Sequence, residues 1–305
     1  MHESLSTHFD TYELHLFCLV AQTGSFTRAA RLAGLTQSAV TRQIQGMEAR
    51  LEVTLFERTT RRVQPTAAGR FLHEQSTRIL GEMTQSIRRL REDFAHAIKT
   101  VVVGVSRTVG LAYLPGFFVD YQRRFPQVQL QVSHRSSPEL LAALEAREID
   151  VALLCPPDRF AGELRVAHRF TDDFTLIVPA GHTLAASRTP IALENLADAL
   201  GPATRWLLPD RRTNTGRRLR IWLGENGLRV HSAMELDSFD LLVNLVGLGM
   251  GVAMVPHRAL PLYLRQRRFC RVPTQPRFQR ELVILVRHES PMREHVRQFV
   301  ERILF

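Results

Sequence analysis

Residues 24–51, GSFTRAARLAGLTQSAVTRQIQGMEARL, predict two short helices joined by a tight turn. Ser25 precedes the first helix and Thr36 the second, and a hydroxyl at the N-cap can accept a hydrogen bond from a free backbone N–H group. Gly34 lies between the helices, where a turn requires backbone freedom. This stretch therefore predicts a helix-turn-helix arrangement, and the rest of the chain is interpreted around it.

The second helix has two different faces. Val40, Ile44, Met47 and Leu51 recur at helical spacing and form one apolar stripe. The other face has amides, hydroxyls and an arginine, which are side chains that read base edges and hold phosphates in the major groove. The residues expected to contact DNA in the two helices are Ser25, Thr27, Arg28, Gln37, Ser38, Thr41, Arg42 and Gln45.

Three arginines follow this helix in a predicted small hairpin, or wing. Arg58, Arg61 and Arg62 are placed to reach backbone phosphates or the minor groove. The alternative interpretation is a solvated turn without a DNA contact.

Thr66 is the expected N-cap of a long helix that runs to about Ala97. Its apolar residues form a seam with partly heptad spacing, which is typical of a helix that pairs with a second subunit. The alternative is that the seam packs against the chain's own domains. The predicted dimerisation residues are Leu72, Ile79, Leu80, Met83, Ile87, Leu90 and Phe94.

From Lys99 onward, predicted strands and helices alternate, which indicates α/β architecture. A βαβαβ unit with a parallel sheet is expected first, and a second α/β unit begins at the strand 174–178. The strand 282–286 and the helix 292–304 remain and suggest a return to the first unit. Two lobes with a cleft between them are therefore expected.

Ligands of open α/β sheets lie beyond the carboxyl ends of the strands, near helix N-termini that favour anions. The hydroxyls and arginines there suggest an anionic ligand, although Ser137 and Ser238 could be N-caps and Asp237 a turn residue. The expected effector contacts are Ser106, Arg107, Thr108, Arg135, Ser136, Ser137, Cys155, Leu208, Pro209, Arg211, Asp237 and Ser238.

The composition is that of a globular protein, with 45% hydrophobic and 23% charged residues. A net charge of +10 favours a polyanionic partner. No apolar run approaches the roughly 18 residues of a membrane helix. Residues 1–17 show no basic region followed by an apolar core, so no signal peptide is expected. Only three cysteines are present, which suits a reducing cytoplasm and excludes a Cys-rich zinc site. The histidines show no metal-ligand spacing, so neither metal nor cofactor is expected.

Several longer segments resemble the LysR-type transcriptional regulators. They are LHLFCLVAQTGSFTRAARLAGLTQSAVTRQIQGME, LFERTTRRVQPTAAG, YLPGFFVDYQRRFPQVQL, SSPELLAALEAREIDVALL and VNLVGLGMGVAMVP. The resemblance implies a mixed α+β and α/β chain: a winged helix-turn-helix, a long linker helix for dimerisation, and a two-lobed effector domain of periplasmic-binding-protein type. The implied domains are 1–65 for DNA binding, 66–97 for the linker, 98–172 with 273–305 for lobe I, and 173–272 for lobe II.

The sequence departs from the family pattern at three positions. Glu52 follows the second helix where the family usually has glycine, which takes a left-handed C-cap at little cost. Gly46 lies inside that helix and costs up to about 1 kcal/mol relative to alanine. Pro65 stands where leucine is usual and stiffens the exit from the wing. None of these changes removes a DNA-facing group.

The resemblance implies a non-enzymatic regulator of double-stranded promoter DNA that forms dimers or tetramers and responds to a small molecule in the cleft. The alternative within the family is a constitutive regulator, or a redox-responsive one that would use Cys155 or Cys270. From another class, a solute-binding or enzymatic α/β protein is the competing hypothesis. The chain shows no nucleophile–base pair and no paired carboxylates, which argues against an enzyme.

Overall fold

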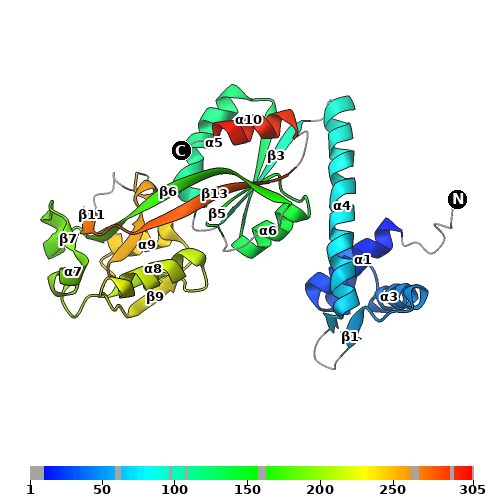
Figure 1. Cartoon of the computed structure of the whole chain (residues 1–305), viewed down its shortest axis with the longest axis horizontal. Helices are drawn as coiled ribbons and strands as arrows, with labels where there is room; N and C mark the ends of the chain where they lie inside the picture. Colours follow the sequence, from blue (N-terminus) through cyan, green and yellow to red (C-terminus); the bar gives the residue numbers. More distant parts are fainter. Residues whose placement is uncertain are drawn as a thin grey trace. The chain divides into compact units, whose positions relative to one another are not determined.

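A computed structural model of the chain describes residues 10–58, 63–95, 98–106, 109–156, 163–261, 263, 268–288 and 292–303. The chain divides into two units, one of Met1–Ala97 with Ala146–Glu148 and one of Ile98–Glu145 with Ile149–Phe305. Figure 1 shows both units, with labels on many of their elements. Among the described helices, none is both long and apolar enough to cross a membrane.

The first unit begins with three helices, α1 (Thr11–Thr23), α2 (Phe26–Ala33) and α3 (Gln37–Leu51). Their N-caps are Asp10, Ser25 and Thr36, and each side chain accepts a hydrogen bond from a backbone N–H group of its helix. The caps predicted at Ser25 and Thr36 are therefore confirmed. Gly24 and Gly34 end α1 and α2 in the left-handed conformation, which glycine adopts without a steric penalty.

An aromatic core holds these helices against a two-stranded wing, β1 (Phe56–Arg58) and β2 (Val63–Pro65). The rings of Phe17 and Phe56 are 5.2 Å apart, and those of Phe26 and Phe56 are 5.9 Å apart. Phe56 therefore anchors the wing between α1 and α2.

The long helix α4 (Ala67–Phe94) starts directly after Thr66, as predicted, and ends close to the expected position. The Thr66 hydroxyl accepts a hydrogen bond from the Gly69 N–H group at 3.0 Å and donates one to the Thr54 carbonyl at 2.7 Å. A Cβ atom at Gly69 would lie 2.1 Å from the Leu55 carbonyl oxygen, so only glycine allows α4 to approach the wing this closely.

Lobe I of the second unit is built around three parallel strands. The order β5–β3–β4 confirms the expected βαβαβ unit. One face of these strands packs against α5 and α10, and the other packs against α6. The elements of this lobe are β3 (Lys99–Ser106), α5 (Gly110–Arg124), β4 (Val128–Arg135), α6 (Ser137–Glu145), β5 (Val151–Leu154) and α10 (Glu294–Arg302).

Two long antiparallel strands, β6 (Leu164–Pro179) and β13 (Gln279–Arg287), run side by side between the lobes (Figure 1). β13 also pairs antiparallel with β5, which confirms that the chain returns to lobe I. The strands of the βαβαβ unit are parallel as expected, and β13 and β6 extend their sheet with antiparallel pairings, so the whole sheet is mixed. The expected strand 174–178 is only the last part of β6.

Lobe II packs its strands and helices around one apolar cluster. β8 and β9 pair in parallel, and β10 and β11 each pair antiparallel with β6. The elements of this lobe are η2 (Thr183–Ala186), β7 (Ile191–Ala192), α7 (Leu193–Leu200), β8 (Trp206–Pro209), α8 (Asn214–Glu225), β9 (Ser232–Leu236), α9 (Phe239–Gly247), β10 (Ala253–Pro256), η3 (His257–Ala259), β11 (Phe269–Val272) and β12 (Thr274–Gln275).

Candidate functional site

The outer face of α3 carries polar side chains, and its predicted apolar stripe is buried except at Leu51, the last residue of the helix, which is 37% exposed. Val40, Ile44 and Met47 have no exposed surface, so they fix the rotation of the helix. On the opposite side, Gln37, Ser38, Arg42 and Gln45 are exposed. The two-faced helix expected from the sequence is therefore present, with a row of hydrogen-bonding groups directed away from the core.

Two polar contacts hold α3 in place at its C-terminal end. The Glu48 carboxylate accepts hydrogen bonds from the N–H groups of Leu55 and Phe56, at 2.8 and 3.1 Å. The Arg50 guanidinium forms an ion pair with Glu13 of α1 at 2.7 Å. These contacts connect α3 to the wing and to α1, so its outer face is presented by a fixed frame.

The candidate DNA-contacting side chains of α2 and α3 differ in whether they already form hydrogen bonds within the chain. The Ser25 hydroxyl caps α2, and the Thr41 hydroxyl donates to the Gln37 carbonyl at 2.8 Å. The Arg28 guanidinium donates to the Thr23 carbonyl. Thr27 and Arg42 are exposed, and Arg42 has no hydrogen-bond or ion-pair partner in the part of the chain that the structure describes.

Of the wing candidates, Arg58 ends β1 and pairs with Val63 of β2. Arg61 and Arg62 lie outside the described residues. The hairpin itself was predicted from the sequence, and its antiparallel register confirms it.

The seam of α4 divides into two parts. Leu72 and Leu80 are half-buried and pack against the core of the N-terminal helices. The remaining apolar side chains have 43–80% of their surface exposed in the single chain, which is unusual for large hydrophobic residues on one helix. They are Ile79, Met83, Ile87, Leu90 and Phe94.

In the second unit, a buried polar cluster joins the two lobes. The Arg280 guanidinium of β13 donates to the Asp172 carboxylate of β6 at 2.8 Å and to the Thr215 hydroxyl of α8 at 2.9 Å. The Cys155 Sγ atom, just after β5, lies 3.3 Å from the Thr215 hydroxyl and 3.9 Å from Arg280 Nη1. The arginine also lies over the rings of Phe174 and Phe239.

The local structure explains how these side chains meet. Arg280 and Asp172 are direct partners in the antiparallel ladder, so they leave the sheet on the same face. Thr215 lies in the first turn of α8, whose N-cap is Thr213. A Cβ atom at Gly216 would lie 2.1 Å from the Asp210 carbonyl oxygen, so glycine is needed for α8 to begin this close to β8.

The predicted effector residues occupy different environments. Ser106 ends β3 with 5% of its surface exposed, and its Oγ atom has no hydrogen-bond partner among the described residues. Cys155 belongs to the buried cluster. Arg135 and Ser137 are half-buried beside Ser136, which is exposed and whose hydroxyl donates to Glu139 at 2.7 Å in the first turn of α6.

Most of the predicted effector residues of lobe II are buried or already form contacts within the lobe. Leu208 and Pro209 are buried in β8. Arg211 is exposed and forms an ion pair with Glu235 at 2.7 Å, and hydrogen bonds from Arg211 lower the pKa of that carboxyl. Asp237 is exposed, and Ser238 caps α9. Arg107 and Thr108 lie outside the described residues.

The sequence reasoning missed Arg280, Asp172 and Thr215. Asp172 was placed at the lobe boundary because the strand was expected to start at Phe174. One sequence pattern could have pointed to Asp172: it is a polar residue on the same strand face as the apolar Phe170 and Phe174, which indicates a buried polar group. Among the described residues, no group of three or more His, Cys, Asp or Glu side chains could hold a metal ion.

Comparisons with known proteins agree with this architecture. The profile of the LysR substrate binding domain matches residues 95–304, and that of the bacterial regulatory helix-turn-helix protein, lysR family, matches residues 12–70. The probable RuBisCO transcriptional regulator of Cyanidioschyzon merolae is 29% identical over 253 residues, covering 81% of each chain.

Solved structures share the fold at lower sequence identity. Full-length OxyR from Pseudomonas aeruginosa is 22% identical, with a TM-score of 0.69 over 97% of this chain and 95% of that one. CbnR in complex with its target DNA is 21% identical, with a TM-score of 0.65 over 97% and 99% of the chains. The chain therefore belongs to the LysR family of DNA-binding transcriptional regulators, which join a helix-turn-helix to an effector-binding domain.

Proposed function

We propose that α3 enters the major groove of promoter DNA and that Arg42, Gln37, Ser38 and Gln45 contact base edges there. The supporting observation is that these four side chains are exposed on one face, while the opposite face is locked into the core. An α-helix fits the major groove, and arginine and glutamine are suited to bidentate contacts with bases. Thr27, Arg28 and the wing arginines Arg58, Arg61 and Arg62 then contact the phosphate backbone.

LysR-type regulators form oligomers, and we propose that α4 supplies the dimer contact of this one. Large apolar side chains are stabilised when they leave water, and Ile87, Leu90 and Phe94 remain exposed in the single chain. Pairing with the same helix of a second copy would cover them. Leu72 and Leu80, which pack within their own unit, contribute to α4 attachment instead.

We propose that the cleft between the lobes binds a small-molecule effector. The observation that supports this proposal is the buried cluster of Arg280, Asp172, Thr215 and Cys155, whose polar side chains connect the two lobes. Buried polar groups of this kind fix the orientation of a ligand and give specificity. Ser106 adds a buried hydroxyl without a partner among the described residues.

An effector that hydrogen bonds to Thr215 would change the contacts between α8 and β13, and so the relative positions of the lobes. Hydroxyls and Arg280 favour a carboxylate or another anion as the group that binds. Because the relatives are transcriptional regulators, we propose no catalytic step. The cytoplasm, where promoter DNA is found, is the proposed location.

The experiment measures the thermal unfolding of the full-length protein with benzoate, a monocarboxylate, for the wild type and for Thr215→Val. Because a ligand that binds the folded state raises the unfolding temperature, stabilisation is expected for the wild type and not for Thr215→Val. Thr189→Val, which removes an exposed hydroxyl, is the control and should behave as the wild type.

Stabilisation that survives Thr215→Val would place the ligand elsewhere. A protein whose DNA binding does not respond to benzoate but changes reversibly on peroxide treatment, with the change lost in Cys155→Ser, would instead support the redox alternative.

A further inference from the structure

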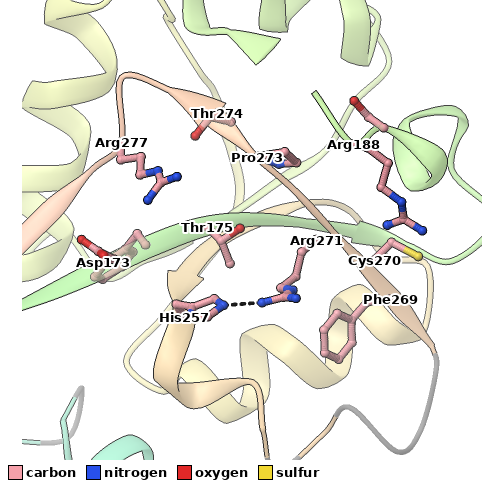
Figure 2. A pocket seen from close by; sticks show the side chains of 12 residues that line it. Asp173, Thr175, Arg188, His257, Phe269, Cys270, Arg271, Pro273, Thr274 and Arg277 are labelled. Atoms are coloured by element: carbon pink, nitrogen blue, oxygen red, sulfur yellow. Dashed lines mark hydrogen bonds between the residues drawn. The ribbon is translucent and has the colours of Figure 1, made fainter. Parts of the chain in front are cut away.

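A cavity of about 580 Å³ lies in lobe II between β6, β11, the segment after β11 and η3 (Figure 2). Asp173, Phe174 and Thr175 of β6 line it, whereas Asp172 pairs with Arg280, which also lies over the ring of Phe174. Because successive side chains of a strand point to opposite faces, Asp173 and Thr175 lie on the other face of β6 from Asp172. The cavity is therefore lined mainly from the face opposite the effector cluster, and of the residues named for the cluster only Phe174 is shared.

Three arginines from three different segments line this cavity. Figure 2 shows Arg188, Arg271 and Arg277 around Thr175 of β6. In the part of the chain that the structure describes, none of the three forms an ion pair with a carboxylate. The one acidic side chain of the lining, Asp173, accepts a hydrogen bond from Gln279 at 2.6 Å. The cavity therefore carries an excess of positive charge.

Two further observations indicate a ligand site and not a solvated basic surface. Thr274 has 3% of its surface exposed and lines the cavity, and its Oγ1 atom has no hydrogen-bond partner among the described residues. A buried hydroxyl without a partner is costly, and an anion oxygen would satisfy it. Arg271 donates to His257 Nε2, so this imidazole nitrogen is an acceptor and orients the guanidinium.

The chemistry of the lining defines the class of ligand. Guanidinium groups bind carboxylate and phosphate oxygens through paired hydrogen bonds. The volume is that of a metabolite site, and Phe269 adds an apolar wall for a carbon skeleton. We propose that this cavity is a second effector site, which binds a small organic anion carrying two or more carboxylate or phosphate groups.

The site is placed to act on the cluster between the lobes. Arg277 lies three residues before Arg280 on the segment that enters β13, and Asp173 is adjacent to Asp172 on β6. An anion that draws Arg277 toward Thr274 therefore acts on the start of the strand that carries Arg280. This proposal does not require a ligand in the cleft between the lobes.

The test is isothermal titration of the full-length protein with citrate and with inorganic pyrophosphate at constant ionic strength. Saturable binding of one anion per chain is expected. Arg271→Gln combined with Arg277→Gln should weaken it by about tenfold or more, since each substitution removes a charged hydrogen-bond donor. Thr274→Val should weaken binding severalfold without removing charge.

Arg229→Gln is the matched control, because it removes one exposed positive charge of lobe II away from the cavity. This variant should bind the anions as the wild type does. Equal loss in Arg229→Gln would show non-specific attraction, and loss in Thr215→Val would place the anion in the cleft between the lobes. Each of these two results would overturn the proposal. So would an unchanged affinity of the double variant, or the absence of saturable binding by the wild type.

Discussion

Arg280 and Asp172 face each other across β13 and β6, with the guanidinium Nη2 atom 2.8 Å from the carboxylate Oδ2 atom. Their side chains have 1% and 0% of their surface exposed, so both charges are removed from water. A buried charge without its partner is strongly unfavourable. The pair therefore ties the two strands together where the chain passes from one lobe to the other.

Asp172→Asn should destabilise the second unit by about 3 kcal/mol, because it leaves the Arg280 charge buried without a counter-ion. Both tryptophans, Trp206 and Trp222, lie in this unit, so their fluorescence during urea unfolding reports it selectively. Asp173→Asn, on the exposed neighbour, is the control and should change the free energy of unfolding by less than about 0.5 kcal/mol. Equal effects of the two substitutions would show that the buried pair is not important for stability.

Glu52→Gly should stabilise the first unit by about 1 kcal/mol. Glu52 ends α3 with φ of 54° and ψ of 29°, a left-handed conformation that costs a residue with a Cβ atom about 1–2 kcal/mol. Part of this gain is offset by the greater freedom of glycine in the unfolded chain. Amide hydrogen exchange in α3 measures the effect, and Glu52→Ala, which keeps the Cβ atom, should give no such gain.

The pH dependence of the first unit should include a contribution from His73. Burial lowers the pKa of this imidazole below 6.5, and its Nε2 atom has no partner among the described residues. Folding therefore favours the neutral ring. The resulting stability is complete above pH 6.5 and is lost as the pH falls below that value toward the folded-state pKa.

Amide hydrogen exchange of α1 in the wild type and in His73→Leu, compared at each pH, checks this expectation. The stability of the wild type relative to His73→Leu should fall on acidification below pH 6.5, because leucine has no proton to bind. A constant difference would show that His73 does not titrate on unfolding.

The apolar face of α4 gives a prediction about assembly. Ile87→Asp combined with Leu90→Asp should shift the sedimentation of the protein toward the monomer, because the proposed contact would then bury carboxylates. Arg89→Asp is the control, since Arg89 is exposed on the same helix and is not part of the apolar seam. An unchanged oligomer in the double variant would contradict dimerisation through α4.

Local sequence signals predicted the first unit well. The caps Ser25, Thr36 and Thr66 and the stripe of Val40, Ile44 and Met47 all lie within a few residues of the features they define, so short-range patterns were sufficient. Strands β3 and β5 of lobe I were recognisable as continuous apolar runs for the same reason, whereas β4 alternates apolar and polar residues.

Strands β6 and β13, which run between the lobes, and the buried cluster of Arg280, Asp172 and Thr215 were not predictable from local patterns. The first half of β6 alternates half-buried residues with the exposed Arg165 and Arg169, so it lacks an apolar run. The meeting of Arg280 with Asp172 and Thr215 depends on the register of β13 against β6 and on the start of α8. Such contacts join residues more than sixty positions apart, and no local pattern encodes them.

The central claim is that α3 reads DNA through Arg42. Gel-shift titration of the DNA upstream of the protein's own gene, with non-specific DNA as competitor, tests it most directly. Arg42→Ala should lower specific affinity by about tenfold or more, while the unfolding of the protein stays unchanged, because the side chain is exposed and its loss removes only base contacts. Arg123→Ala, the same loss of charge on α5, should bind as the wild type does. Wild-type specific affinity in Arg42→Ala would contradict the account.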